Sequence, residues 1–381
     1  MSVPLYDLSP TLGVAGVGLL LALVPYLWFR RRHRGAGPAS RLRALTLLTL
    51  FLSFDLVLLG AYTRLSDSGL GCPDWPGCYG HASPVGARSA ITQAEAAMPT
   101  GPVTHEKAWV EMAHRYSATA IGALIALLAA LSIAASRRGT APVSPWWPLA
   151  TLAWIGVQGA FGALTVTMKL YPAIVTLHLL GGLVLLALLV VQFERYEPRP
   201  LRLSPSLRAG LIAVAVLAVV QIALGGWVST NSAVLACKEF PTCQGTWWPE
   251  TDFAGGFVLQ RPLGGDGAGG YLPYQALTAI HMAHRVGAFV VLPLLALLAW
   301  RLHAQGGAAR PWSAAVAAIA LWQTASGLGN VLLGWPLASA VAHTAGSSGL
   351  VVVLTILLVR SRGGVRRPVP SWPRGAATAA S

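Results

Sequence analysis

The sequence predicts an all-α polytopic membrane protein, built as two tandem four-helix transmembrane bundles related by pseudo-two-fold symmetry plus one extra N-terminal helix. Three observations predict this fold: few charges, nine long apolar runs, and an internal repeat that covers most of the chain. The 381 residues are 55% hydrophobic and only 10% charged, whereas a soluble chain has roughly 25% charged residues. So few charges cannot solvate a surface of this size. The composition excludes a soluble enzyme, a disordered protein and a nucleic-acid-binding protein, despite the formal net charge of +14.

The apolar runs are long enough to be transmembrane helices, because a bilayer core takes about 20 residues per helix. They cover 11–29, 44–63, 109–135, 146–167, 173–193, 208–229, 275–300, 312–333 and 338–359. The segments 64–108 and 230–274 are polar and rich in Gly, Pro and Trp, which predicts ordered loops or short surface helices outside the lipid. No small-residue cleavage site precedes Arg30, so we expect the first helix to be retained.

Lys and Arg predict the orientation of the chain. The connections after the first, third, fifth and seventh runs, with the C-terminal segment, carry 19 of the 27 Lys and Arg residues. The positive-inside rule makes these segments cytoplasmic. The two long loops then face the periplasm of a bacterial inner membrane. The basic surplus is therefore explained by topology, with membrane lipid as the surroundings and no nucleic-acid partner.

The internal repeat divides the chain into two similar halves. At one constant spacing, residues of the first half recur in the second: Gly60, Cys72, Pro76, Cys78, Gly80, Gln158, Gly162 and His178 recur as Gly225, Cys237, Pro241, Cys243, Gly245, Gln323, Gly327 and His343. The segment Met112-Ala113-His114-Arg115 recurs at a slightly longer spacing as Met282-Ala283-His284-Arg285. An even number of spans separates the copies, so both insert the same way up. This symmetry differs from that of inverted-repeat transporters.

The repeat also sets the expected domain boundaries. We expect an extra transmembrane helix with a basic cytoplasmic loop, an N-terminal bundle, a C-terminal bundle and a basic cytoplasmic tail, over 1–43, 44–193, 208–359 and 360–381. The first helix and the tail stand outside the repeat.

Four histidines lie at similar depth in these runs, about six to eight residues or roughly 10 Å from the outer ends. A single intramembrane histidine often only bonds to a neighbouring helix. Two per repeat, however, are typical of paired imidazoles that hold heme iron from both sides. We therefore predict two bis-histidine heme sites, formed by His114 with His178 and by His284 with His343.

Other metals fit these residues less well. Zinc or copper needs a compact cluster with cysteine or further ligands. A di-iron centre needs four carboxylates, and the spans offer only Glu111 and Asp55. For Asp55 itself, a proton path or a polar contact between helices is the expected role.

The two copies differ beside the first histidine of each, where Glu111 corresponds to His281. A carboxylate in a low-dielectric site can take or give a proton, so the first bundle is the candidate for chemistry and the second for a permanent heme. The alternative role for Glu111 is an acid favoured by the helix dipole. Arg115 and Arg285 are candidate partners of heme propionates, or snorkel to the interface.

The cysteines form two pairs in the outer loops, Cys72 with Cys78 and Cys237 with Cys243. The outer compartment permits disulfides, and five intervening residues that include proline allow a suitable Cα separation. We predict two intraloop disulfides, which staple lids over the heme sites or exchange with thiols. A zinc site shared by all four cysteines is the weaker alternative.

The motifs resemble one family. The run GAYTRLSDSGLGCPDWP at 60–76 and the pattern Glu111-x-x-His114-Arg115 resemble the first outer loop and the second-helix signature of heme A synthases. His178, His284 and His343 match the other histidines of that family. The resemblance covers about 44–360 and leaves the helix at 11–29 outside it.

The resemblance implies an activity. Such enzymes oxidise the C8 methyl group of heme O to a formyl group by two hydroxylations and loss of water, giving heme A for cytochrome oxidases. By this likeness, heme O lies between His114 and His178 with Glu111 as the catalytic carboxylate, and a heme b cofactor lies between His284 and His343. Heme O synthase and cytochrome oxidase assembly factors are the expected partners, and a homo-oligomer is compatible with the sequence. The alternatives are a di-heme b-type, quinol-linked electron-transfer cytochrome and a transporter without heme.

Overall fold

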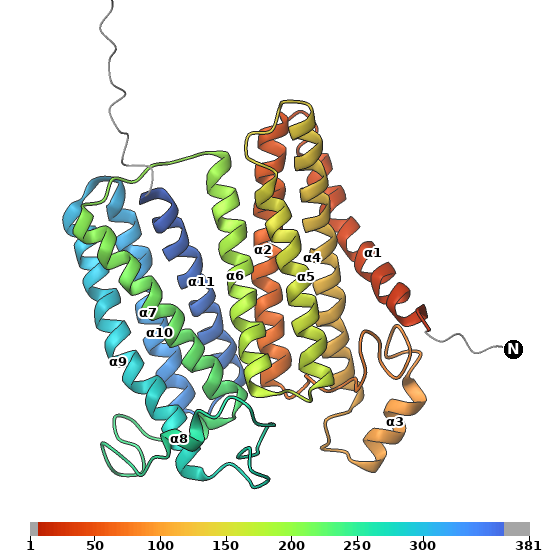
Figure 1. The fold of residues 1–381 in the computed structure, drawn as a ribbon, viewed down its shortest axis with the longest axis vertical. Coiled ribbons are helices and arrows are strands. Elements are labelled where there is room, and N and C mark those ends of the chain that lie inside the picture. Colours follow the sequence, from red (N-terminus) through yellow and green to blue (C-terminus); the bar gives the residue numbers. More distant parts are fainter. Residues whose placement is uncertain (1–6, 362–381) are drawn as a thin grey trace, which may run out of the picture.

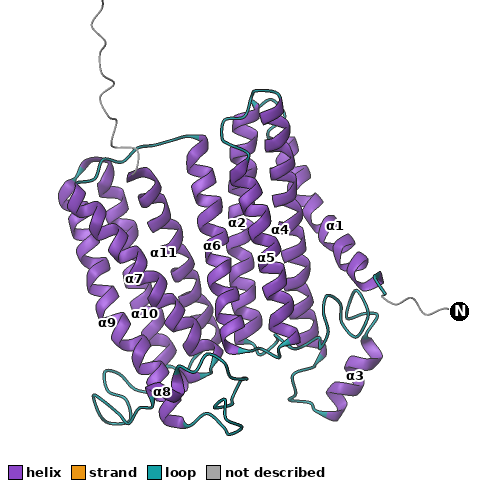
Figure 2. Cartoon of the chain, in the orientation of Figure 1, coloured by secondary structure: helices purple, strands orange, loops and turns teal. Residues whose placement is uncertain are grey.

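The computed structural model describes residues 7–361, so the predicted basic tail lies almost entirely outside the described residues. Within them the chain is helical, with isolated β-bridges but no strand (Figure 2). Nine of its helices are long and apolar enough to cross a membrane, as the sequence predicts. They are α1 (Ser9–Arg32), α2 (Pro38–Leu65), α4 (His105–Arg137), α5 (Trp146–Thr167), α6 (Pro172–Tyr196), α7 (Pro205–Thr230), α9 (Tyr274–Gln305), α10 (Arg310–Leu332) and α11 (Leu337–Ser361).

Eight of the nine long helices make two similar sets of contacts, and we call α2, α4, α5 and α6 the first group and α7, α9, α10 and α11 the second (Figure 1). In the first group α2 packs against α4 and α6, and α5 packs against the same two helices. In the second group α7 packs against α9 and α11, and α10 packs against the same two helices. The four histidines of interest are on α4, α6, α9 and α11. Each group therefore carries its two histidines on helices that face each other across the ring rather than on adjacent ones.

The two groups meet where α6 and α2 pack against α11 and α6 packs against α7. Each end of this contact has an arginine. Arg64 of α2 donates to the backbone oxygen of Ser229 at the end of α7, at 2.8 Å. At the opposite end, Arg360 of α11 forms two hydrogen bonds of 2.7 and 2.8 Å with the buried carboxylate of Glu194 on α6. Charge-assisted bonds of this kind fix the relative position of the groups.

The extra helix α1 lies against α4 (Figure 1). At Gly18 a Cβ atom would come within 2.5 Å of the Thr119 side chain of α4, so glycine is what lets the two helices approach. Nearer its N-terminal end, Val14 belongs to a buried apolar cluster with Cys72 and Met112. The helix therefore supports both α4 and the first disulfide loop.

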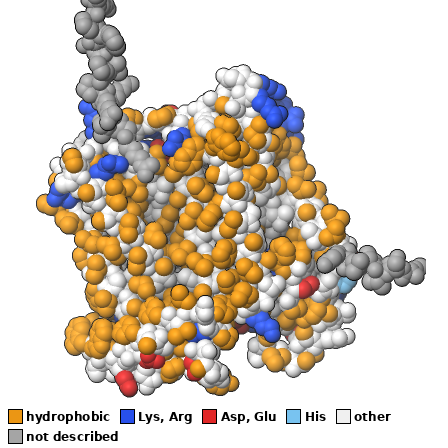
Figure 3. Space-filling view, viewed as in Figure 1, with side chains coloured by type: hydrophobic (Ala, Val, Ile, Leu, Met, Phe, Trp, Pro, Cys, Tyr) orange, Lys and Arg blue, Asp and Glu red, His pale blue; other side chains and the backbone are white. Residues whose placement is uncertain are grey.

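The outside of the protein is apolar (Figure 3). Large side chains such as Leu20 and Val24 of α1 and Leu321 of α10 are more than half exposed. Such a surface is stable only against lipid, which makes the chain a multi-pass membrane protein. Most Lys and Arg side chains visible in Figure 3 lie at the ends of the helices away from the long loops.

The two long loops lie at the same end of the molecule (Figure 1). The first contains the surface helix α3 (Arg88–Ala97), and the second contains the short helices η1 (Ala233–Ala236) and α8 (Phe253–Gly256). A further short helix, η2 (Gly307–Ala309), precedes α10 at the other end. The histidine-bearing segments of the long helices are near the ends that these long loops cover.

Candidate functional site

Each of the four histidines lies against a glycine of a neighbouring helix. A Cβ atom at Gly60 or Gly225 would come within 3.0 Å of the ring of His114 or His284, respectively. These two contacts are equivalent in the repeat. Only glycine leaves room for the ring without pushing it aside, which explains why the residue recurs.

The second histidine of each half has the same arrangement. A Cβ atom at Gly162 would lie 3.6 Å from the ring of His178, and one at Gly327 would lie 3.3 Å from the ring of His343. Both glycines are on the helix that precedes the histidine in the chain. The repeat therefore preserves the packing around the imidazoles as well as the imidazoles themselves.

The rings of His284 and His343 are neighbours in an edge-on arrangement, with centroids 6.4 Å apart and planes at 84°. Two imidazoles on opposite sides of one metal ion have centroids about 6 Å apart, given metal–nitrogen bonds of about 2 Å. His114 and His178 lie on α4 and α6, the helices of the first half that correspond to α9 and α11. Across residues 7–361, no group of three or more His, Cys, Asp or Glu side chains could hold a metal ion. The available donor sets are thus pairs of imidazoles, which suits an iron porphyrin with its own four nitrogens.

Glu111 is buried, with 3% of its surface exposed, and it bonds to the first disulfide loop and to its own helix. Its Oε2 accepts a hydrogen bond of 2.7 Å from the backbone N–H of Cys72, and its Oε1 forms an ion pair with Arg115. The close approach of the loop needs Gly71, where a Cβ atom would come within 2.4 Å of the Lys107 backbone. The carboxylate is therefore held in one orientation, one helical turn from His114.

Arg115 joins this carboxylate to the loop. Its guanidinium donates to the backbone oxygens of Asp74 at 2.8 Å, Pro76 at 3.3 Å and Cys72 at 3.4 Å. The disulfide between Cys72 and Cys78 closes the same loop. The arginine thus binds backbone carbonyl groups of the loop that the disulfide closes.

The second half repeats this arrangement with one change. Arg285 donates to the backbone oxygens of Thr242 at 2.9 Å and Glu239 at 2.6 Å, inside the loop closed by the Cys237–Cys243 disulfide. His281, in place of the carboxylate, has its Nδ1 atom 3.1 Å from the backbone oxygen of Ala233. The second loop is therefore held without a carboxylate.

These contacts bear on three expectations from the sequence. All four cysteines are in disulfides, so the shared zinc site is wrong. The guanidinium groups of Arg115 and Arg285 bind loop carbonyls, and their pairing with heme propionates stays a prediction. Asp55 is exposed on α2 and has no hydrogen-bond or ion-pair partner within 7–361, so its predicted proton path gains no support.

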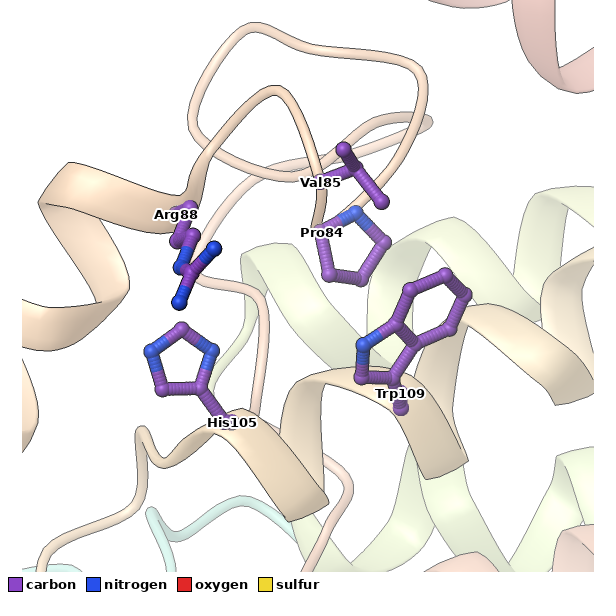
Figure 4. A pocket seen from close by; sticks show the side chains of 5 residues that line it. All are labelled: Pro84, Val85, Arg88, His105 and Trp109. Carbon is purple, nitrogen blue, oxygen red and sulfur yellow. The ribbon is translucent and has the colours of Figure 1, made fainter.

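A hollow of about 310 Å³ lies beside the first long loop, at the N-terminal end of α4 (Figure 4). It is lined by Pro84, Val85, Arg88, His105 and Trp109. It contains none of the residues that the sequence marks for chemistry. His105 bonds to Thr92 of α3 at 2.9 Å, which ties the surface helix to α4.

Sequence reasoning missed the side chains that contact the histidine Nδ1 atoms. Gln221 of α7 has its Nε2 atom 3.0 Å from Nδ1 of His284, and Ser326 of α10 has its Oγ atom 3.0 Å from Nδ1 of His343. Neither residue is part of the repeat. A mismatch between the two halves could have pointed to them, because each is a polar residue in a span whose counterpart in the other half is apolar.

The chain is similar in sequence to proteins of one family. A sequence model of the family described as cytochrome oxidase assembly protein matches residues 43–355. A heme A synthase of Shewanella oneidensis is 38% identical over 314 residues, covering 81% of this chain and 93% of the relative. A heme A synthase of Caulobacter vibrioides is 28% identical, covering 83% of this chain and 93% of the relative. A heme A synthase of Halalkalibacterium halodurans is 27% identical, covering 84% of this chain and 98% of the relative.

Proposed function

The chain belongs to the heme A synthase family of cytochrome oxidase assembly proteins, and we propose that it oxidises the C8 methyl group of heme O to a formyl group. The product is heme A for cytochrome oxidase. The observation that carries this proposal is the family match over 43–355, which includes Glu111 and all four paired histidines.

The proposed architecture is two four-helix bundles, 44–193 and 208–359, related by a pseudo-two-fold axis along the membrane normal. The equivalent packing of α2, α4, α5 and α6 and of α7, α9, α10 and α11 supports it. So do the equivalent contacts of Gly60 with His114 and of Gly225 with His284. The segments 1–43 and 360–381 stand outside this proposed symmetry.

The second bundle is proposed to hold heme b between His284 and His343. The 6.4 Å between the two ring centroids and the glycines that make room for both rings support this assignment. Heme b would supply one-electron transfer. The chain's own contribution is to keep both imidazoles in place on separate helices and to exclude water with the loop closed by Cys237 and Cys243.

The first bundle is proposed to bind the substrate, heme O, between His114 and His178. The Nδ1 atoms of both rings are buried without a hydrogen-bond partner in the part of the chain that the structure describes. Glu111 is the proposed catalytic carboxylate, which accepts a proton as the methyl group is oxidised. Its bonds to Cys72 and Arg115 support this role, because they keep a charged group buried and oriented beside His114.

The rival function is a di-heme electron-transfer cytochrome. Such a protein needs two permanent hemes but no carboxylate in one half alone. Glu111 is matched by His281, and the relatives found are heme A synthases. Both observations favour the synthase.

The proposal extends to the setting of the reaction. The basic connections support a bacterial inner membrane, with the disulfide loops on the periplasmic side. Heme O synthase as supplier of the substrate, and cytochrome oxidase assembly factors as recipients of the product, are proposed partners. A homo-oligomer is compatible with the apolar exterior.

The test is the Glu111→Gln variant in cells that also make heme O, with hemes extracted and separated by chromatography. We expect heme A formation to fall about 10²- to 10⁴-fold, as for loss of a general base, while bound heme b stays. Glu106→Gln is the matched control, because Glu106 is an exposed acid in the first turn of the same helix. Undiminished heme A in the Glu111→Gln cells would show that the catalytic assignment is wrong.

A further inference from the structure

The cores of the two groups differ on the side of the histidines that faces away from the long loops. In the first group, six polar side chains there are at most 3% exposed: Thr46, Thr49, Ser53, Ser132, Thr151 and Gln192. At the spacings of the repeat they correspond to Leu211, Val214, Ala218, Leu302, Val316 and Leu357. All six counterparts belong to one buried apolar cluster of the second group. The first group therefore has polar side chains where the second has an apolar core.

These polar side chains lie on the same helix faces as the residues of the histidine sites. Residues separated by a whole number of turns share a face, and Ser132 lies about five turns along α4 from His114. Ser53 lies about two turns along α2 from Gly60, whose Cβ position faces the His114 ring. The polar side chains therefore line the interior of the first group and not its lipid-facing surface.

Three polar atoms of this set have no hydrogen-bond partner in the described part of the chain. They are Oγ of Ser53, Oγ of Ser132 and Oε1 of Gln192. The threonines are different, because each donates to a backbone oxygen of its own helix, as Thr46 does to Leu42 at 2.9 Å. A buried polar group without a partner is costly and rare. The three atoms therefore need partners that the protein itself does not supply.

Water fits this need better than a change in side-chain packing. It can donate to an amide oxygen and also accept from a hydroxyl, and a buried water typically makes two to four such bonds. Room for it is indicated by the side chains themselves, since Thr46 and Ser132 are smaller than the leucines at the equivalent positions of the second group.

Gln192 connects the set to the end of the helices that carries most of the visible Lys and Arg side chains. Its Nε2 atom donates to Oγ1 of Thr46 at 3.2 Å and to the hydroxyl of Tyr196 at 3.0 Å. Tyr196 is the last residue of α6 and is half-buried. A polar path therefore leads from the end of α6 into the interior of the first group.

We propose that this set of polar side chains binds internal water, which reaches from the end of α6 to the level of Ser53. The second group is dry at the equivalent positions. The inference goes beyond the proposed function and does not depend on it, because water binding is measured without heme A formation. It gives the interior of the first group alone a connection to solvent at the end away from the long loops.

The experiment uses the infrared S–H band of a single introduced cysteine in the purified full-length protein, transferred from H₂O to D₂O. All four native cysteines are in disulfides, so the introduced residue supplies the only S–H group. Ser53→Cys and Ala218→Cys occupy equivalent positions of the repeat and are matched controls for each other. We expect exchange at least about tenfold faster in Ser53→Cys, because apolar burial raises the pKa of a thiol and each pKa unit lowers the thiolate fraction about tenfold.

Thr49→Cys and Val214→Cys form a second equivalent pair, which keeps the test open if a variant at the first pair of positions fails to fold. Thr49→Cys should exchange faster than Val214→Cys by the same reasoning. Equal rates within either folded pair would overturn the inference.

Ser53→Ala separates bound water from a hydroxyl that is simply unpaired. Removing an unpaired buried hydroxyl stabilises a protein, whereas removing one that binds water does not. We therefore expect no rise in the thermal midpoint of Ser53→Ala in detergent. A higher midpoint would show that the site is dry, and neither result bears on whether the protein makes heme A.

Discussion

Glu111 accepts a hydrogen bond of 2.7 Å from the backbone N–H of Cys72, a residue 39 positions earlier in the chain. The bond joins the buried carboxylate of α4 directly to one half-cystine of the first long loop. Arg115, one turn further along α4, ion-pairs with the same carboxylate and donates to carbonyls of that loop. The orientation of the Glu111 carboxylate therefore depends on the conformation of the disulfide loop.

Removing the first disulfide should disturb the carboxylate. The bridge between Cys72 and Cys78 spans six positions, for which loop-closure entropy gives a stabilisation of about 2 kcal/mol. We expect Cys72→Ser with Cys78→Ser to lower heme A formation several-fold, because the N–H that binds Glu111 becomes mobile. Heme A yield and heme b content in membranes are the two measurements.

The equivalent double variant of the second half is the control for this prediction. Cys237→Ser with Cys243→Ser removes a bridge of the same length beside a site without a carboxylate. It should reduce heme b retention first and heme A only as a consequence. Identical losses of heme b from both double variants would contradict the link between Cys72 and Glu111.

We expect Arg115 to contribute more to the stability of the folded protein than to the binding of heme. Arg115→Met leaves a buried carboxylate without its cation, which typically costs about 3–5 kcal/mol, and removes the donors to the loop. We expect a lower thermal midpoint in detergent, monitored by circular dichroism. The double variant with Glu111→Gln should recover part of the loss. Simple additivity of the two changes would mean that the pair is not coupled.

Most of the fold could be predicted from the sequence because the bilayer sets the length of each helix. The run 109–135, for example, became the helix His105–Arg137. Helix α3 was not located, because it is only 10 residues long in a polar segment and a single buried residue, Ile91, anchors it.

The candidate site could be predicted only in part. The repeat identified the four histidines, and the mismatch with His281 identified Glu111, since residue type and depth are visible in a sequence. The partners of Arg115 are backbone carbonyls, whose direction depends on the loop conformation. The contacts of Gln221 and Ser326 depend on how their helices are rotated, which apolar runs of this kind leave open.

Substitution of the glycines beside the histidines should perturb each of the two sites separately. Gly225→Ala places a Cβ atom 3.0 Å from the His284 ring and should displace it, lowering heme b content. Gly60→Ala does the same to His114 and should lower heme A formation while heme b stays bound. Heme extraction and absorption spectra of the purified variants measure both outcomes. Gly122→Ala is the control, because no atom lies within 4 Å of the added Cβ.

Helix α1 should support the first half alone. Gly18→Leu forces a side chain into the space of Thr119 on α4, because even an added Cβ atom would come within 2.5 Å of the threonine side chain. Overpacking of this kind costs about 1–3 kcal/mol and should shift α1 away from the helix that carries Glu111 and His114. We expect a lower thermal midpoint and reduced heme A, with heme b content unchanged because α1 packs on the first group of helices.

Gly16→Leu makes the same substitution on the same helix at a position with nothing within 4 Å of the added Cβ atom. It adds the same apolar volume, and on a helix surface that already exposes leucines the lipid accommodates it. The pair therefore separates contact with α4 from a general effect on insertion of the helix. Equal losses in Gly16→Leu and Gly18→Leu would show that α1 acts through insertion, and loss of heme b in Gly18→Leu would show that its influence reaches the second half.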